Sequence, residues 1–431
     1  MRKHHTSPEP RYTRPLRTIL ALSIAPVVLA GAVLVAGCGS GSTTGSTSST
    51  TAPNPSAAAS QTADLWSGAA VTTTPMSEAD VAAFDKVNEA TMAVKGAPPG
   101  MWIGVWDPKK GRHIGGYGEA VIDGAKATDA DHGRIGSVTK TFTATAILQQ
   151  VAAGKLTLSD TVGTLLPDLA ATYPDLAAIT VEQLLSMHSG IPDYINSGLL
   201  TQQFLDHPER VWTPDEIIAV VLDKTKVDPS VAEYSTTNYL ILGEILRKVT
   251  GQAPDVVITS VATALGLNDT ALPAPADTAM PAPASAGYIM DAGVASLKEA
   301  GGTAKSGTTV QDATPSWGAA GGGMYSTVAD LGTWGASGLG TATLPQVLGD
   351  QRLQSRPIKP GIDYGLGIID WGNGWIGHTG QAIGWEAVVA YNTKTGAVFV
   401  GMVNETASLM SVAPVMMQYF PDLAQPVFVG K

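Results

Sequence analysis

A serine and a lysine three residues apart, Ser137 and Lys140, form the pair of side chains with the clearest capacity for chemistry. They stand at the start of a predicted helix, where residues three apart share a face, so the Lys140 amine can reach the Ser137 hydroxyl. A serine hydroxyl is a weak nucleophile until a neighbouring group accepts its proton. A lone Ser-x-x-Lys also arises by chance in a serine-rich chain, so the pair requires partners elsewhere.

Two later stretches supply candidate partners. One is Glu233-Tyr234-Ser235-Thr236-Thr237-Asn238-Tyr239, and the other is Gly377-His378-Thr379-Gly380-Gln381. Tyrosine and histidine side chains can exchange protons with a nucleophile, although either residue is also common in purely structural roles. No group of His, Cys and acidic residues has the spacing of metal ligands, so we expect neither a metal nor another cofactor.

The helix that carries Lys140 must be buried, because Val138, Phe142 and Ala146 place apolar side chains along it, and Gly154 can end it. The rest of the middle is also predicted to be helical. Thr180 caps one helix, and residues 212–222 and 239–249 form two more. Residues 271–315 are rich in Ala, Pro, Gly and Thr, which predicts an irregular connection with one short helix near residues 294–300.

Strands are predicted at both ends of the domain. A helix starting near Ser77 precedes a hairpin of residues 101–106 and 114–120. Near the C-terminus, Ser326 is expected to cap a helix over residues 327–337. The predicted strands that follow are residues 364–370, 375–378, 385–391 and 397–403, and residues 408–419 form a closing helix. The pattern predicts an α+β fold (an α/β sandwich) in which one antiparallel sheet uses both termini and a helical lobe, roughly 137–315, is inserted.

The N-terminal segment predicts export. Basic residues precede an almost purely apolar run from Ile19 to Gly37, which ends in Ala36-Gly37-Cys38. This is the layout of a secretory signal, residues 1–37, and its ending resembles a bacterial lipobox with Cys38 as the lipidated residue. An uncleaved membrane anchor is the alternative, because the apolar run approaches spanning length. Either reading places the protein outside the cytoplasm, as a lipoprotein of the bacterial cell envelope in the first case.

The composition indicates a linker followed by one large domain. Residues 39–62 contain Gly, Ser, Thr, Ala and Pro without a charged side chain, so we predict a flexible linker over 38–76 and a folded domain over 77–431. Hydrophobic residues make up 44% of the chain, enough for a sizeable core. The net charge of −11 argues against nucleic acid as a partner, because nucleic-acid binding depends on basic patches.

Taken in order, the three stretches resemble the signature motifs of the serine β-lactamase and penicillin-binding protein family. The similarity is greatest to the branch of class C β-lactamases and D-alanyl-D-alanine carboxypeptidases and esterases, whose second motif begins with tyrosine and whose third can read His-Thr-Gly. Residues 184–191 and 321–327 also resemble that branch, so the resemblance covers roughly residues 77–420. It implies a β-lactamase/transpeptidase-like fold and a serine hydrolase.

The resemblance implies a role for each matching side chain. Ser137 would attack a carbonyl and become acylated, and Lys140 would help to relay the hydroxyl proton. Tyr234 would be a phenolate-like base or a proton shuttle, its pKa lowered by the charge of Lys140. His378, on an edge strand facing the site, would polarise this network or a substrate carboxylate.

The backbone and the second motif complete the implied site. The N–H groups of Ser137 and Gln381 would hold the oxyanion, and Thr379 and Gly380 would contact the substrate. The second motif departs from the family pattern, because Thr236 stands where asparagine is usual. A threonine hydroxyl can make one hydrogen bond, to the lysine or to the substrate, and it reaches less far than the asparagine amide does. Acylation is compatible with this change, whereas the loss of the asparagine amide argues against recognition of a β-lactam or peptide amide.

Two functions follow. The first is a lipid-anchored serine hydrolase that forms a Ser137 acyl-enzyme from an ester, a D-alanyl peptide of the peptidoglycan type or a β-lactam, with β-lactamase activity the least expected of these. The second is a non-catalytic binding lipoprotein that retains the fold, a reading motivated by Thr236. The intact nucleophile, lysine, tyrosine and His-Thr-Gly favour the enzyme.

Overall fold

The computed structural model describes residues 71–195, 198–359, 361–424 and 427. The predicted signal peptide, Cys38 and residues 38–70 of the predicted linker lie outside them. Backbone contacts with the sheet begin at Thr74, slightly before the expected start at Ser77, because the Arg112 N–H donates to the Thr74 carbonyl at 2.7 Å. None of the helices formed by the described residues combines the length and apolar character needed to cross a membrane.

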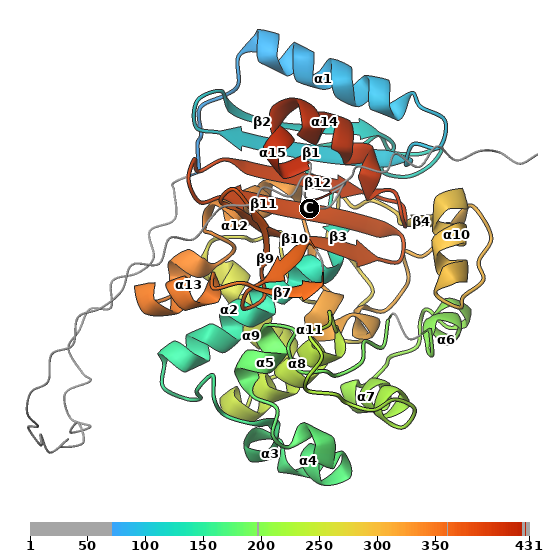
Figure 1. The fold of residues 1–431 in the computed structure, drawn as a ribbon. Helices are drawn as coiled ribbons and strands as arrows, with labels where there is room; N and C mark the ends of the chain where they lie inside the picture. The colour runs from blue at the N-terminus through green and yellow to red at the C-terminus, as the bar shows by residue number, and fades with distance from the viewer. Residues whose placement is uncertain (1–70, 196–197, 360, 425–426, 428–431) are drawn as a thin grey trace, which may run out of the picture. The chain divides into compact units, whose positions relative to one another are not determined.

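Both ends of the described chain build one antiparallel eight-stranded sheet, ordered β2-β1-β12-β11-β10-β9-β8-β7 (Figure 1). Strand β1, near the start of the described chain, pairs with the last strand, β12, so that Trp102 lies opposite Met402 and Gly104 opposite Val400. The strands are β1 (Gly100–Asp107), β2 (Gly111–Gly118), β7 (Arg356–Lys359), β8 (Ile362–Tyr364), β9 (Ile369–Gly372), β10 (Trp375–Ala382), β11 (Trp385–Asn392) and β12 (Val398–Val403). The predicted α+β sheet from both termini is confirmed.

The helices precede, interrupt and follow the strands. In chain order they are α1 (Glu78–Met92), η2 (Gly136–Val138), α2 (Thr139–Ala152), α3 (Val162–Leu165), α4 (Pro167–Thr172), η3 (Pro174–Leu176), α5 (Val181–Leu185), α6 (Thr201–Asp206), α7 (Pro214–Leu222), α8 (Thr237–Thr250), α9 (Pro254–Ala264), α10 (Asp291–Glu299), η4 (Pro315–Trp317), α11 (Ala319–Gly322), α12 (Val328–Ala336), η5 (Thr341–Thr343), α13 (Gln346–Arg352), η6 (Leu409–Val412), α14 (Ala413–Tyr419) and α15 (Pro421–Ala424). Most of them lie between β2 and β7, as the predicted helical insertion requires.

Helices cover both faces of the central strands. Glycine lets α12 approach one face closely, since a Cβ on Gly332 would lie 2.1 Å from the Trp106 ring. On the other face, Gly401 of β12 points toward Val412, just before α14, and α1 packs against α14. Alternate residues of a strand point to opposite faces, so the sheet contributes to two apolar layers.

The helical lobe presents the start of α2 to β10. The first ten residues of α2 are all buried, although four of them are threonines. Their hydroxyls are satisfied by neighbouring carbonyls: Thr141 donates to Val138 at 2.7 Å, and Thr143 donates to Ala320 at 2.6 Å. The buried Arg352 adds a hydrogen bond to Thr145 at 2.7 Å. A helix with many polar side chains can therefore pass through the core and hold its N-terminus fixed.

Three local expectations are corrected. Thr327, rather than Ser326, caps α12, because Ser326 pairs with Gly133 across the short strands β3 (Gly133–Arg134) and β6 (Tyr325–Ser326). Residues 364–370 form parts of two strands, separated by a turn in which Gly367 has a φ of +79°. The connection 271–315 contains the two short strands β4 (Tyr288–Ile289) and β5 (Thr308–Thr309) besides α10.

Candidate active site

Ser137 lies in the short turn η2, which leads directly into α2, and Lys140 is the second residue of that helix. The Lys140 Nζ lies 2.9 Å from the Ser137 Oγ, so the three-residue spacing brings amine and hydroxyl into contact as predicted. Lys140 is fully buried, and its amine also donates to the Gly321 carbonyl at 2.8 Å and the Thr236 Oγ1 at 3.2 Å. Three oxygen atoms therefore fix the position of the amine.

Burial also sets the proton affinity of Lys140. It lowers the pKa of Lys140 to about 7, and attraction to Asp193 opposes this shift. A neutral amine carries two N–H groups and one lone pair. The Gly321 carbonyl can only accept a hydrogen bond, and the Thr236 hydroxyl can accept the second. The lone pair is then directed to the Ser137 hydroxyl, which is the arrangement of a general base.

Tyr234 completes the contacts around the nucleophile. Its hydroxyl is hydrogen-bonded to the Ser137 side chain, and the Lys140 Nζ lies 5.0 Å from its ring centroid. Burial raises the pKa of Tyr234 well above its ordinary value. The expected phenolate-like state is therefore wrong, because burial penalises an anion and the nearby amine is itself partly neutral. The geometry is compatible with the other expected role, a neutral phenol that passes a proton.

Thr236 lies beneath Lys140 and away from solvent. Its side chain is 1% exposed, its hydroxyl contacts the lysine, and its backbone N–H donates to the Asp193 carboxylate at 3.0 Å. The methyl group packs against Gly321, where a Cβ would lie 2.6 Å from the Thr236 Cγ2. The expected contact of Thr236 with substrate is thus contradicted, because the side chain is enclosed by these neighbours. Its position is that of a residue that holds the lysine.

Asn238, the remaining asparagine of the second motif, cannot take the place of the missing one. It lies in the first turn of α8 and is fully buried. Its side chain accepts a hydrogen bond from the Ser189 hydroxyl at 2.7 Å and donates to the Leu184 carbonyl at 3.2 Å. These bonds join α8 to α5 and the turn after it, so Asn238 has a structural role.

His378 is buried, and both of its ring nitrogens have partners. Nδ1 contacts the Thr379 carbonyl, which can only accept, so Nδ1 carries the proton. Nε2 is then an acceptor for the Tyr364 hydroxyl at 2.9 Å. Burial, followed by repulsion from Lys140, lowers the pKa of His378 to about 3. A neutral ring would polarise the proton-transfer network or a substrate carboxylate through its dipole rather than through a positive charge, and both expected roles stay predictions. The His378 ring centroid lies 6.1 Å from that of Tyr234.

The backbone N–H groups of Ser137 and Gln381 lie beside each other. A Cβ added to Gly380 would be 3.0 Å from the Ser137 nitrogen, and one added to Gly136 would be 2.4 Å from the Gln381 nitrogen. Ala382 pairs with Trp385 across a two-residue loop, which turns the Gln381 N–H away from β11. The two nitrogens are therefore near each other, which is compatible with the predicted oxyanion hole.

The strand that carries Gln381 has one open edge. β10 is an inner strand of the sheet, and β9 pairs with it only over Trp375–Gly377. From His378 onward, β10 has no strand on that side among the described residues, and this edge lies against η2. The expectation of an edge strand therefore holds for this half of β10 only. The close approach of the strand explains the glycine at 380, because a Cβ there would lie 1.9 Å from the Ile135 carbonyl oxygen.

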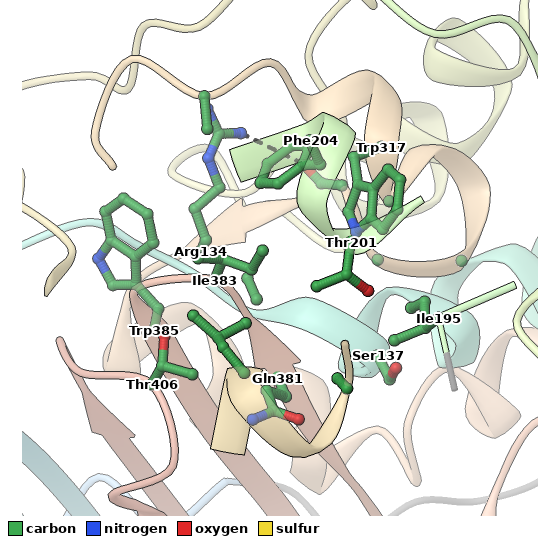
Figure 2. Close-up of a pocket in the computed structure, with 18 of the residues that line it drawn as sticks. Arg134, Ser137, Ile195, Thr201, Phe204, Trp317, Gln381, Ile383, Trp385 and Thr406 are labelled. Atoms are coloured by element: carbon green, nitrogen blue, oxygen red, sulfur yellow. Dashed lines mark hydrogen bonds between the residues drawn. The ribbon is translucent and has the colours of Figure 1, made fainter. Parts of the chain in front are cut away.

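A cavity of about 360 Å³ opens beside Ser137. Ser137 and Gln381 lie at one end, and the aromatic rings of Phe204 and Trp317 lie at another, as Figure 2 shows. Lys140, Tyr234, Thr379 and Gly380 are not among the residues that line it. Trp317 thus lines the cavity, whereas Trp375 packs against Phe420 with ring centroids 5.3 Å apart.

Two functional positions escaped sequence reasoning. Asp193 is a buried carboxylate that accepts the N–H groups of Thr236 at 3.0 Å and Ile195 at 3.3 Å. The backbone carbonyl of Gly321 accepts a hydrogen bond from Lys140. Every residue has such a carbonyl, so the residue type at this position could not indicate the contact. The nearest signal for Asp193 was the sequence Ser189-Gly190-Ile191-Pro192-Asp193, a turn with an acid just after a helix. Within the described residues, no group of three or more His, Cys and acidic side chains has the arrangement of a metal site.

Known proteins are similar to this chain in sequence and in fold. A family model described as Beta-lactamase matches residues 82–415. Protein flp of Staphylococcus aureus (strain NCTC 8325 / PS 47) is 34% identical over 148 residues, 34% of this chain and 29% of that protein. The matched stretches span between 27% and 35% of the lengths of the first curated relatives.

Among solved structures, a D-stereospecific amidohydrolase from Streptomyces sp. is 28% identical with a TM-score of 0.67, over 79% of this chain and 98% of that one. The D-amino acid amidase from Ochrobactrum anthropi SV3, complexed with L-phenylalanine amide, is 22% identical with a TM-score of 0.66. That alignment covers 78% of this chain and 97% of the other, and it shows the common fold.

Proposed function

Since this chain belongs to the beta-lactamase family of serine hydrolases, we propose that it hydrolyses amides or esters through an acyl-enzyme on Ser137. The observation that carries the proposal is the Lys140 amine, 2.9 Å from the Ser137 Oγ and with a pKa of about 7. A base with a pKa near the working pH is half-neutral yet still accepts a proton readily.

In the first half-reaction, the Ser137 Oγ attacks the substrate carbonyl carbon while its proton passes to the Lys140 lone pair. The oxyanion forms between the N–H groups of Ser137 and Gln381. Collapse of the tetrahedral intermediate breaks the bond to the leaving group, which takes up the proton held by the Lys140 ammonium. The proton passes either directly or through Tyr234, which donates its hydroxyl proton while receiving another from Lys140, so that both residues end neutral. The product of this step is an ester on Ser137.

In the second half-reaction, water attacks that ester and gives its proton to the same network. The oxyanion forms again between the two backbone donors, and its collapse releases the acid and returns the proton to Ser137. Neither half-reaction needs a cofactor, because Lys140 only accepts protons and returns them. The contact between Thr236 and Lys140 removes the main reason for the non-catalytic reading, because the threonine still holds the lysine.

The names of structural relatives support an amide as the substrate. The Streptomyces protein is called a D-stereospecific amidohydrolase, and its aligned region covers 98% of its length. We propose that this chain acts on an amide or ester of a small acid of the amino-acid type. Export and lipid attachment at Cys38 remain part of the proposal on the strength of the N-terminal sequence alone.

The proposal is tested with purified full-length protein and a fluorophosphonate probe, which labels activated serines. We expect labelling at Ser137, together with hydrolysis of p-nitrophenyl acetate or of D-phenylalanine amide. Ser137→Ala should abolish both, whereas a control variant at an exposed serine, Ser159→Ala, should leave both unchanged. Absence of labelling and of turnover in the wild-type protein would overturn the proposal.

A further inference from the structure

We infer that the cavity beside Ser137 selects substrates by bulk and by charge: it accepts a large apolar group and disfavours a free carboxylate next to the scissile bond. The inference rests on the proposed function and narrows its substrate class to amides and esters without such a carboxylate. The inference excludes β-lactams and peptides that end in a free D-alanine as preferred substrates, because both carry a carboxylate beside the bond that is cleaved.

The walls of the cavity are apolar. Phe204 of α6 and Trp317 of η4 lie against each other with ring centroids 4.9 Å apart and form one wall. Ile383 and Trp385, from the hairpin between β10 and β11, lie on another side, as Figure 2 shows, and Leu297 of α10 also lines the cavity. Such a lining stabilises a bulky apolar group by removing it from water.

Two of the polar groups on these walls already have partners within the protein. The Trp385 indole N–H donates to the Ser285 hydroxyl at 3.0 Å. The Thr406 hydroxyl accepts from the Gly384 N–H at 2.6 Å. A charged substrate group placed there would lose its water without gaining these atoms as new partners, which is energetically costly.

Arg134 is the one cationic side chain that lines the cavity in the described part of the chain. Its guanidinium donates to the Thr278 carbonyl at 3.0 Å and to the Gly323 carbonyl at 3.3 Å. The residue is only 5% exposed, and the carboxylate of Asp277 attracts it from nearby. Two carbonyls and a nearby carboxylate thus already compensate part of this charge, so Arg134 attracts a substrate carboxylate less strongly than a guanidinium without these neighbours would.

The other titratable groups near Ser137 also provide no accessible positive charge for a substrate carboxylate. Lys140 is fully buried, and three oxygen atoms surround its amine. His378 is neutral, with both nitrogens engaged. At the rim, the exposed Glu299 adds a negative charge to the lining, and it repels an anion weakly through water. Charge around the cavity thus disfavours a carboxylate, whereas a neutral amide meets no such penalty.

Binding to a non-hydrolysing variant tests the inference independently of catalysis. The protein is full-length Ser137→Ala, and the probes are N-acetyl-D-phenylalanyl-D-alanine, its C-terminal amide and the two L counterparts. Occupancy is measured by the change in the protein's tryptophan fluorescence on binding, because Trp317 and Trp385 lie in the cavity wall. The probes form a D pair and an L pair, each consisting of an acid and its amide. In whichever pair binds more tightly, we expect the amide to have a Kd at least ten times lower than that of the acid. Replacing phenylalanine by alanine in the amide should weaken binding at least tenfold.

A cation placed in the cavity should reverse the charge selection. Ser296 of α10 lines the cavity and is half-buried. Ser296→Lys should reduce the preference for the amide at least threefold, and Ser296→Met, of similar length without charge, should leave it intact. Equal or tighter binding of the acid by the Ser137→Ala protein, or binding of neither probe, would overturn the inference. Failure of Ser137 labelling in the wild-type protein would instead overturn the proposed function.

Discussion

Two regions meet at Ser137, and their polar atoms are arranged in opposite ways. In the nucleophile cluster, defined as Ser137, Lys140, Tyr234 and Thr236, polar atoms point toward one another within a buried space. In the substrate cavity, apolar side chains point inward while Trp385 and Arg134 direct their N–H groups to protein acceptors. The first arrangement activates a hydroxyl, and the second leaves an apolar space for a substrate.

This contrast shows which contacts determine reactivity and which determine substrate selection. The nucleophile cluster depends on a few hydrogen bonds whose loss changes the chemistry. The cavity depends on the combined shape of α6, α10, η4 and the β10–β11 hairpin, so a change at one position alters which substrate fits. Variants in the two regions should therefore separate into effects on kcat and effects on KM.

The largest effect is expected for Lys140→Met, which removes the proposed base and keeps a side chain of similar length. We expect kcat/KM to fall by about 10²-fold to 10⁴-fold, the range of general-base catalysis. The melting temperature should not fall, because methionine avoids the cost of burying an amine. The exposed Lys155→Met is the control. Retained activity in Lys140→Met would assign the proton transfer to another group.

The cavity is tested by Phe204→Ala, which removes one aromatic wall. We expect KM for a phenylalanine amide to rise by about 10-fold to 100-fold, because the apolar group of the substrate loses part of its contact area. Hydrolysis of p-nitrophenyl acetate, which has no bulky acyl group, should change little. Equal losses on both substrates would show that the two regions are not separable.

Thr236→Val tests the support of the lysine with a nearly isosteric change. It removes the oxygen that contacts the Lys140 amine at 3.2 Å. The loss of one hydrogen bond of about 1 kcal/mol predicts a decrease of about five-fold in kcat. Thr236→Ser keeps the hydroxyl and should restore most of the activity. The contrary result, an unchanged kcat in Thr236→Val, would remove Thr236 from the nucleophile cluster.

The smallest effect is a shift of the pH profile. If Lys140 acts as the neutral base, kcat/KM rises with pH through an acidic limb near its pKa of about 7. Asp193 attracts the ammonium form and holds this pKa up, so Asp193→Asn should move the limb to lower pH. Asparagine can still accept the N–H groups of Thr236 and Ile195. A limb that stays in place would leave Asp193 with a structural role only.

Much of the fold could be predicted from the sequence because its signals are local. The helix capped by Thr180 is confirmed, and α7 and α8 lie within two residues of the predicted ranges 212–222 and 239–249, because helix signals act on adjacent backbone groups. The break between β8 and β9 could not be predicted. It depends on the turn at Gly367, where a Cβ would lie 2.3 Å from Ala144 of α2, and that contact exists only after folding.

The sequence by itself determined which side chains could react. It placed Ser137 and Lys140 three residues apart, and it supplied a tyrosine and a glycine-containing strand in the expected order. Only the tertiary structure decided the charge states, because burial acts through neighbours that are distant in sequence. It leaves Lys140 with a pKa of about 7, keeps Tyr234 protonated and makes His378 neutral. The shape and polarity of the cavity were likewise decided by packing between segments that lie far apart in the chain.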